Sequence, residues 1–300
     1  MKLQTVALCL GVALLVLGGA YAGYWYYVAG RLQDGIDAWV EQQRAAGNEV
    51  AIADGSIGGF PFAFRRDFGA AEMRLQGGVA ARIAAGSAIA EIKPWNLNTV
   101  IVTARDVSVS GAPGIYKAAA LDGSIDIPTA PPADYHQPLL EFDLTATDVT
   151  LPEGQRAVTA GPIEALAARG AIMGPVPMAP DVGQALAGWA NAGGVLELKS
   201  FNFAQAPLAA AGEGTLALDE ALQPLGALTL RAHGVAETVA LLQQDGLLDA
   251  RNAKTALLMV NGLAKPDEAG KALVKISLSL QEGFVWVGPI KLAPLPRLNW

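Results

Sequence analysis

Cysteine and histidine are scarce in this sequence of 300 residues. The only cysteine, Cys9, lies near the amino terminus, so the rest of the chain can form no disulfide, thiolate metal site or cysteine nucleophile. The two histidines, His136 and His233, have no other histidine or cysteine at the spacing of metal ligands. The sequence therefore predicts neither a metal site nor a cofactor.

Motifs of the familiar enzyme classes are also missing. There is no G-x-S-x-G nucleophile elbow, and a P-loop, a kinase loop and a calcium loop are absent. Residues 212–217 fit the dinucleotide pattern G-x-G-x-x-A, but alternating leucines follow instead of a helix whose dipole would hold a pyrophosphate. We therefore expect a protein that is not an enzyme and has no catalytic residues.

Charge is scarce as well: 16% of the residues are charged, and the net charge is −7 without a cluster of lysine and arginine. Nucleic-acid binding is excluded, because it draws its affinity from the neutralisation of phosphates. The 52% of hydrophobic residues exclude a disordered chain. A membrane protein of many helices is excluded too, because only one stretch is long and apolar enough to span a bilayer.

That stretch lies at the amino terminus. No charged residue occurs between Lys2 and Arg31, and the centre, Val6–Gly19, consists mainly of leucine, valine, alanine and glycine. Such a run is long enough to cross a bilayer as a helix. It ends at residues 24–27, Tyr-Trp-Tyr-Tyr, which are side chains of the kind that collect where membrane meets water. We expect residues 1–30 to form a single-pass transmembrane anchor.

A cleaved signal peptide is the alternative interpretation, with Ala20-Tyr21-Ala22 as the cleavage site. In both cases the rest of the chain crosses the membrane. Lys2 stays in the cytoplasm by the positive-inside rule, whereas acidic residues soon follow Arg31.

Residues 31–48 are predicted to form an amphipathic helix next to the membrane. Leu32, Ile36, Trp39 and Val40 recur at helical spacing, and Gly47-Asn48 ends the segment. The apolar stripe of this helix either packs on the body of the protein or lies along the bilayer surface.

From residue 49 to residue 300 the dominant period is two. Residues 140–145 and 274–281 alternate apolar and polar side chains, as half-buried strands of antiparallel sheets do. Near Arg105 and near Thr147 the apolar positions change parity, which predicts a β-bulge with one extra residue. Residues 181–192 predict a short helix, and residues 235–260 predict two helices that cover one sheet face.

Four pairs of an acidic residue and a glycine precede alternating apolar residues. Asp-Gly suits the backbone of a tight hairpin turn, and Glu-Gly is a poorer version of it. We therefore predict hairpin turns at Asp54-Gly55, Asp122-Gly123, Glu213-Gly214 and Glu282-Gly283.

Two aromatic motifs stand out. Residues 58–64 place Phe60, Phe62 and Phe64 on one face of an extended segment, and Pro94-Trp95-Asn96 ends one strand and begins a turn. The rings are interpreted either as a core plug that closes one end of the sheet or as the apolar lining of a lipid groove. In the second interpretation the ligand-binding residues are Phe60, Phe62, Phe64 and Trp95.

These motifs resemble those of a bacterial family, the domain of unknown function 2125. The resemblance rests on the anchor, on both aromatic motifs and on the closing Gly288-Pro289, Leu295-Pro296 and Trp300, and it covers essentially the whole chain. It implies a membrane-anchored envelope protein of alphaproteobacteria without an established activity. More distantly, the chain is similar to AsmA-like envelope proteins, which implies a role in phospholipid transport or outer-membrane homeostasis.

These observations predict a mainly β protein of the α+β class. We expect an N-terminal transmembrane helix, then a large twisted antiparallel sheet with a few covering helices. The protein would sit in the bacterial inner membrane, with residues 49–300 as a periplasmic domain. The expected function is to bind or guide lipid, or another apolar ligand, along an apolar sheet face. The alternative is a structural or adaptor module that binds a partner envelope protein through a sheet edge.

Overall fold

The computed structural model describes residues 2–76, 81–111, 114–152, 161–177, 179, 182–287, 290–295 and 297–298. The side chains of residues 2–12, 182, 290 and 292–294 lie outside this description. The C-terminal motif residues Gly288, Pro289, Pro296 and Trp300 also lie outside the described residues.

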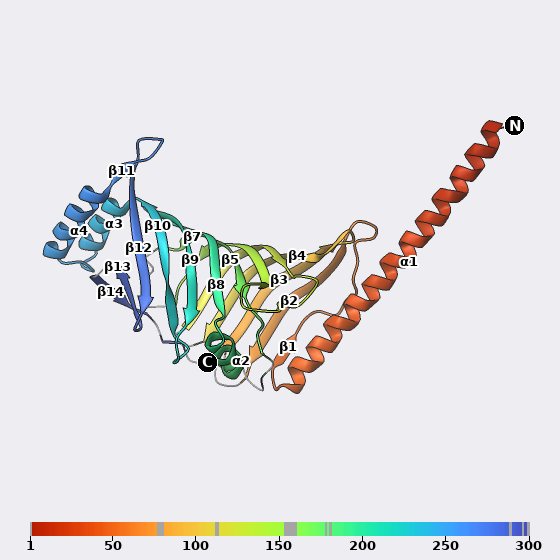
Figure 1. Ribbon diagram of the computed structural model, residues 1–300, viewed down its shortest axis with the longest axis horizontal. Helices are drawn as coiled ribbons and strands as arrows, with labels where there is room; N and C mark the ends of the chain where they lie inside the picture. The colour runs from red at the N-terminus through yellow and green to blue at the C-terminus, as the bar shows by residue number, and fades with distance from the viewer. Residues whose placement is uncertain are drawn as a thin grey trace.

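The described chain is mainly β, as predicted, with one long helix at its amino terminus and three short helices later (Figure 1). The helices are α1 (Lys2–Ala45), α2 (Val182–Asn191), α3 (Val235–Gln244) and α4 (Ala250–Leu263). The strands are β1 (Glu49–Ala51), β2 (Phe64–Leu75), β3 (Ala81–Lys93), β4 (Asn96–Gly111), β5 (Gly114–Asp126), β6 (Pro138–Val149), β7 (Ile163–Met173), β8 (Val195–Gln205), β9 (Leu208–Leu218), β10 (Pro224–His233), β11 (Lys265–Pro266), β12 (Ala272–Gln281), β13 (Phe284–Val287) and β14 (Ile290–Pro294).

The strands form one large antiparallel sheet, which confirms the predicted architecture. Their spatial order follows the chain from β1 to β14, except that β11 pairs only with β12. Neighbours in the sheet are thus neighbours in the chain, through short turns or through longer connections such as the one with α3 and α4 between β10 and β12, so the chain builds the sheet by adding one strand after another. Figure 1 shows that the result is a long, twisted and curved sheet.

One row of side chains crosses the sheet from β2 to β13 without a polar member. Side chains at paired positions point to the same face, and successive residues of a strand point to opposite faces. The pairing register therefore aligns one residue from each strand of this path in a continuous line, which we term the apolar row: Phe64, Ile92, Val100, Ile125, Phe142, Gly170, Leu198, Gly214, Leu228, Leu278 and Val287.

The helix α1 runs unbroken past residue 30, so the expected boundary between residues 30 and 31 falls inside one helix. Its C-terminal half lies beside the edge of the sheet, and its N-terminal part projects beyond the sheet (Figure 1). Val40 is buried, and the Arg44 guanidinium donates a hydrogen bond to the Val50 carbonyl oxygen at 3.0 Å. The predicted amphipathic segment, residues 31–48, therefore packs on the sheet through part of its apolar stripe. Trp39, which also belongs to this stripe, is exposed.

In the part of the chain that the structure describes, no helix is long and apolar enough to cross a membrane. The side chains of residues 6–12, half of the apolar run, lie outside that part. The transmembrane anchor expected for residues 1–30 stays a prediction.

The parity change in β4 and β6 comes from left-handed backbone, and the prediction of an extra residue near Arg105 and Thr147 is wrong. Asp106 and Asp148 have φ angles of 52° and 50°. The register of each strand with both of its neighbours is the same before and after these residues, as the bridge between Lys117 and Thr150 shows for β6. A residue in the left-handed region redirects the strand without lengthening it.

Only Glu282-Gly283, among the four acidic-glycine pairs, forms the predicted hairpin turn, which joins β12 to β13 with φ angles of 55° and 74°. Asp54-Gly55 lies in the loop between β1 and β2, whereas Asp122-Gly123 and Glu213-Gly214 lie inside β5 and β9. The prediction failed inside the strands because these glycines serve cross-strand packing. A Cβ on Gly123 would lie 2.0 Å from the carbonyl oxygen of Asp143 on β6.

The short helices occur where the sequence predicts them, but they cover less of the sheet than expected. The Asp249 carboxylate caps α4 by accepting a hydrogen bond from the Asn252 N–H at 2.9 Å. The pair α3 and α4 contacts β9 and β12 at one end of the sheet, away from β2 to β7 (Figure 1). The two helices therefore cap an end of the sheet and do not cover a face.

The molecule exposes far more surface than a compact protein of its size. Its accessible surface is 18243 Å², whereas a compact monomer of 31.0 kDa has about 12,000 Å². The projecting part of α1 and the open sheet account for this excess. The sheet therefore does not close around a single core.

Candidate functional site

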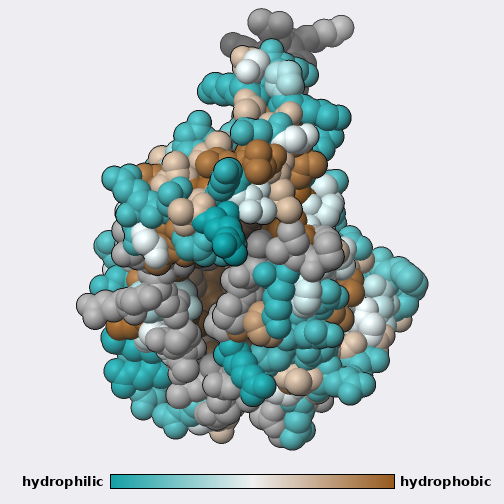
Figure 2. Space-filling view, turned by 90° about the vertical axis from the view of Figure 1, so that its left-hand side faces the viewer, coloured by the Kyte–Doolittle hydropathy of each residue, from teal (hydrophilic) through white to brown (hydrophobic). Residues whose placement is uncertain are grey.

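The face that carries the apolar row is the candidate site, and we term it the apolar trough. Within the apolar row only Phe64 and Gly170 are buried, and the other members are half-buried. If a second layer of helices or strands covered the row, its members would be buried. If the sheet were flat, they would be exposed. Seen from the C-terminal end of the sheet, the molecule is hollowed, with apolar side chains in the depth of the hollow (Figure 2). The molecule is thus concave where it is seen from this end.

Large side chains in the trough lie over glycines of the neighbouring strand. An added Cβ would lie 2.7 Å from Leu228 Cδ2 at Gly214 and 2.9 Å from Leu144 Cδ2 at Gly123. At Gly170 it would lie 3.0 Å from the Cζ atom of Phe142. Because the side chains fold down onto glycine, the space above the sheet stays free. The floor of the trough is therefore smooth and apolar, and its backbone polar groups are paired within the sheet.

The opposite face of the same strands carries charges in cross-strand pairs. Lys199 on β8 and Glu141 on β6 approach to 2.7 Å, and Arg105 on β4 approaches Asp122 on β5 to 2.9 Å. Arg169 on β7 also binds Asp143 on β6. These side chains alternate with those of the trough along each strand, so the charged pairs lie on the face away from the trough.

Helices pack on the sheet near the two ends of the trough. At the first end, the Phe64 ring stacks on the Trp25 ring of α1 with 5.2 Å between their centres. At the other end, α3 contacts β9 and α4 contacts β12, and Ala232 and Val274 are buried in the adjacent strands β10 and β12. Between these ends, the described residues place no helix over the apolar row, so a ligand could reach it from solvent.

The structure separates the four predicted ligand-binding residues. Phe64 is 3% exposed and begins the apolar row, so it belongs to the trough. Phe60 lies outside the trough, edge-on to the Trp25 ring at 5.5 Å and stacked on Tyr26. Phe62 and Trp95 point outward and are 69% and 68% exposed. The interpretation of a single aromatic lining thus fits Phe64 alone among the four.

Sequence reasoning missed most of the trough. Its members are mostly aliphatic residues and glycines, and, apart from Phe64, no short motif marks them. The available signal was the alternation within each strand, which shows that a face is apolar but does not show which strands are neighbours. The register that joins Val100, Phe142 and Leu228 in one row becomes visible only in the folded sheet.

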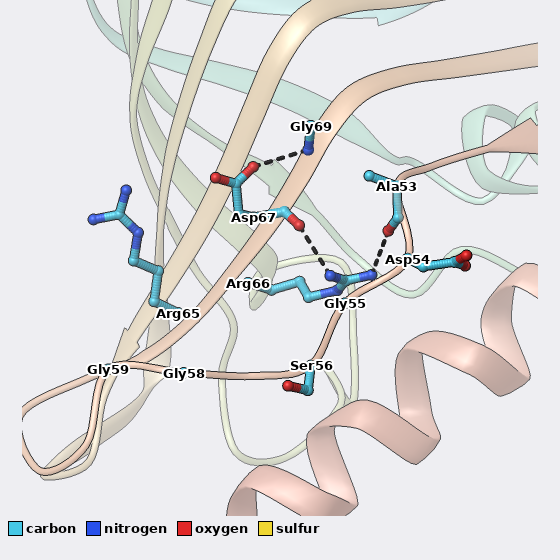
Figure 3. Close-up of a pocket in the computed structure, with 10 residues that line it drawn as sticks. All are labelled: Ala53, Asp54, Gly55, Ser56, Gly58, Gly59, Arg65, Arg66, Asp67 and Gly69. Atoms are coloured by element: carbon cyan, nitrogen blue, oxygen red, sulfur yellow. Dashed lines mark hydrogen bonds between the residues drawn. The ribbon is translucent and has the colours of Figure 1, made fainter.

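A pocket of about 380 Å³ lies between β2 and the loop of residues 53–59 (Figure 3). Arg66 crosses it, although this residue is only 6% exposed. Its guanidinium donates hydrogen bonds to the carbonyl oxygens of Ala53 at 2.7 Å and Asp67 at 2.9 Å. The chain of Gly55 lies against it, since an added Cβ would be 2.1 Å from Nη1.

Carboxylates near this pocket do not pair with Arg66. The Asp54 side chain points away from the guanidinium in Figure 3, and Asp67 accepts a hydrogen bond from the Gly69 N–H at 2.9 Å. The Nε atom of Arg66 is buried without a partner. Arg66 therefore ties the loop after β1 to β2 and closes the edge of the trough, and we assign it a structural role.

The described residues contain no group of three or more His, Cys, Asp or Glu side chains that could hold a metal ion. His233 lies at the end of β10, where its Nδ1 is 3.0 Å from the Ala272 carbonyl oxygen and its Nε2 is 3.7 Å from Asp267. The chemistry that the trough offers is therefore apolar contact over a long surface.

Comparison with known proteins identifies the family of this chain. Neither the curated proteins nor the solved structures contain a match to this chain. A family model described as "Uncharacterized protein conserved in bacteria (DUF2125)" matches residues 25–124 and residues 107–296. These two segments include β1 to β14 and the part of α1 that packs on the sheet. The chain belongs to this bacterial family, the one that its aromatic motifs resemble.

Proposed function

We propose that this protein is a membrane-anchored envelope protein that holds the acyl chains of lipids along its apolar trough. The observation that carries the proposal is the apolar row, which is continuous from β2 to β13 and which, past Phe64 and Ile92 under α1, no described helix covers as far as the other end of the sheet. Acyl chains need a long apolar surface and no specific polar partner. The opposite, charged face would keep the sheet in water.

The size of the trough suits this role. Ten strand spacings of about 4.8 Å give the apolar row a length of roughly 50 Å along the sheet. This length exceeds the hydrocarbon core of a bilayer, which is about 30 Å thick. A surface of this length could hold several acyl chains at once or pass one chain along.

The proposed location follows from the amino terminus. Leu14, Leu15, Val16 and Leu17 are exposed on the part of α1 that projects from the sheet. Exposed leucines in one run indicate an apolar environment around the helix. We therefore keep the proposal of a single inner-membrane anchor with the sheet in the periplasm. The similarity to AsmA-like proteins points the same way and remains a prediction.

The test uses the full chain in lipid vesicles with a phospholipid that carries a photoactivatable diazirine on its acyl chain. Crosslinked peptides are then identified by mass spectrometry. We expect crosslinks to the trough, with a several-fold loss in Leu144→Glu and in Ala168→Glu, its neighbour in the trough. The matched control is Thr145→Glu, one residue further on β6 and on the opposite face. Crosslinks to residues 6–19 serve as the internal standard for membrane insertion.

Equal crosslinking of the trough in Leu144→Glu and Thr145→Glu would refute the proposal. Circular dichroism of each variant ensures that a lost crosslink reports lost binding and not an unfolded sheet. Ala168→Glu provides a second position if Leu144→Glu does not fold.

A second candidate function is favoured by the edge of the sheet. Among the described strands, β14 is the last on the path and pairs only with β13. An unpaired edge can accept a strand from another protein. Recovery of one stoichiometric envelope partner crosslinked to β14, with no lipid in the trough, would support the adaptor function instead.

A further inference from the structure

Exposed apolar side chains form a row where the first strands of the sheet end. Phe62 precedes β2, Trp95 and Leu97 lie at the turn from β3 to β4, and Ile127 follows β5. Leu97 and Ile127 are 46% and 49% exposed, and Phe62 and Trp95 are more exposed still. The Ile127 N–H donates to the Asn98 carbonyl oxygen at 2.8 Å, which fixes the last residue beside the turn. We term this set the aromatic rim.

Hydrogen bonds fix the aromatic rim at one level of α1. The Tyr24 hydroxyl donates to the Pro94 carbonyl oxygen at 3.0 Å, and the Trp25 indole N–H donates to the Ala63 carbonyl oxygen at 3.2 Å. The Tyr21 hydroxyl also donates to the Pro61 carbonyl oxygen. The rim thus lies beside residues 21–25, directly after the apolar run of residues 6–19.

The side chains of the aromatic rim carry no charge, and the charged side chains that adjoin it have partners of their own: Asp126, before Ile127, binds Thr99, and Lys93, before Pro94, pairs with Glu91. Neither residues 55–64 nor residues 94–104 include a charged side chain, and the same holds for residues 3–30 of α1. Tyr26 and Tyr27, further exposed rings, add to the surface on the helix side. Tyrosine and tryptophan on an uncharged surface are typical of the interface between a bilayer and water.

The far ends of the same strands are charged. Glu72 on β2 binds Arg74 at 2.7 Å and Arg82 on β3 at 2.6 Å, and Arg74 also approaches Glu49 on β1 to 3.1 Å. We term this set the charged rim. It lies beside Arg44, and the 23 helical steps from Tyr21 to Arg44 (44 − 21) span about 35 Å. The two rims therefore cannot lie in the same membrane interface.

We infer that the aromatic rim inserts into the interface of the bilayer that α1 crosses, so that the sheet stands on the membrane with its charged rim in water. The inference rests on the proposed anchor, because the level of the rim on α1 places it where the anchor leaves the hydrocarbon. The occupant of this surface is the lipid bilayer itself. Val100 and Ile125 of the apolar row lie three and two residues from Leu97 and Ile127 of the rim. Past the end that α1 covers at Phe64, the trough therefore lies next to the leaflet, and an acyl chain can enter it without crossing water.

Spin labels on single cysteines test this inference in full-length protein reconstituted in phosphatidylethanolamine and phosphatidylglycerol vesicles. Cys9→Ser removes the only native thiol. Cysteine is then introduced by Phe62→Cys or Trp95→Cys in the rim, by Leu14→Cys in the apolar run, and by Glu49→Cys or Leu225→Cys as exposed controls away from the rim. Collision with oxygen reports a lipid environment, and collision with a soluble nickel complex reports water.

We expect the labels at positions 62 and 95 to collide several-fold less with nickel than the labels at positions 49 and 225, and to collide readily with oxygen. A label at position 14 in lipid together with labels at positions 62 and 95 in water would overturn the inference and leave the anchor intact. A label at position 14 in water would overturn the anchor and the inference together. If the labels at positions 62 and 95 collided with neither nickel nor oxygen, the aromatic rim would be covered by a protein partner and not by the bilayer, and the inference would be overturned.

Discussion

The two ends of β2 and β3 are built from the same pair of strands and are held by different forces. At one end, Phe64 and Ile92 pack with Trp25 of α1. At the other end, Glu72, Arg74 and Arg82 form ion pairs on the surface. Burial of large rings contributes far more to stability than exposed ion pairs do. The apolar end therefore fixes α1 to the sheet, and the charged end mainly keeps that side of the molecule in water.

The largest expected effect comes from Phe64→Ala. This substitution removes a buried ring that stacks on Trp25 and begins the apolar row. Loss of a buried phenylalanine ring costs about 3–5 kcal/mol of the free energy of unfolding. Chemical denaturation of the full chain in detergent measures this loss. The matched control is Phe62→Ala, which removes an exposed ring from the same segment and should change stability by less than about 0.5 kcal/mol.

Equal losses in Phe64→Ala and Phe62→Ala would contradict the comparison, because they would mean that the exposed ring also has a tight packing role. The same pair of variants separates stability from membrane contact. Phe62 belongs to the aromatic rim, so Phe62→Ala should leave the fold intact and weaken the contact of the rim with lipid.

The strand alternation and the helical periodicity predicted the mainly β fold, the antiparallel sheet, a helix at 181–192 and two helices within 235–260, and the structure has these helices at 182–191, 235–244 and 250–263. These features depend on neighbours in sequence, such as the Asp249 cap of α4. Glycine misled the prediction, because Gly123 and Gly214 follow acidic residues as turn glycines do. Their role is to make room for Leu144 and Leu228 of the next strand, and that contact depends on register.

The candidate site was predicted less well, because the residues that share a face of the sheet also depend on the register between strands. Phe60, Phe62, Phe64 and Trp95 are conspicuous in sequence, yet only Phe64 lies in the trough. Several aromatic residues in a short motif indicate an apolar surface. A turn such as the one at residues 60–62 can nevertheless point neighbouring rings to different sides. The contact of Phe60 with Trp25 joins residues far apart in the chain, and no local pattern encodes it.

A smaller effect is expected inside the trough from Gly123→Ala. In most extended segments glycine to alanine stabilises the fold by about 0.4–1 kcal/mol, because it restricts the unfolded chain. Here the new Cβ would lie 2.0 Å from the Asp143 carbonyl oxygen, so β5 and β6 must separate. We expect a loss of about 1–3 kcal/mol, measured by chemical denaturation. Ser124→Ala, the next residue on the opposite face, is the control. If Gly123→Ala stabilised the protein, β5 and β6 would be able to move apart at little cost, which would contradict this expectation.

The smallest effect is expected at the charged rim, from Glu72→Gln. The hydrogen bond from Arg82 lowers the pKa of the Glu72 carboxyl below its ordinary value of 4.5, and Arg74 acts in the same direction. A lowered pKa means that the ionised carboxylate stabilises the folded state above pH 4.5, and that this contribution disappears as the pH falls through the lowered value. The thermal unfolding midpoint of the native chain should therefore fall on acidification more than that of Glu72→Gln. Glu268→Gln, in the turn between β11 and β12, controls for general acid effects. If Glu72→Gln lowered stability as much as Phe64→Ala, the ion pairs between β2 and β3 would contribute as much to stability as the burial at the other end of these strands.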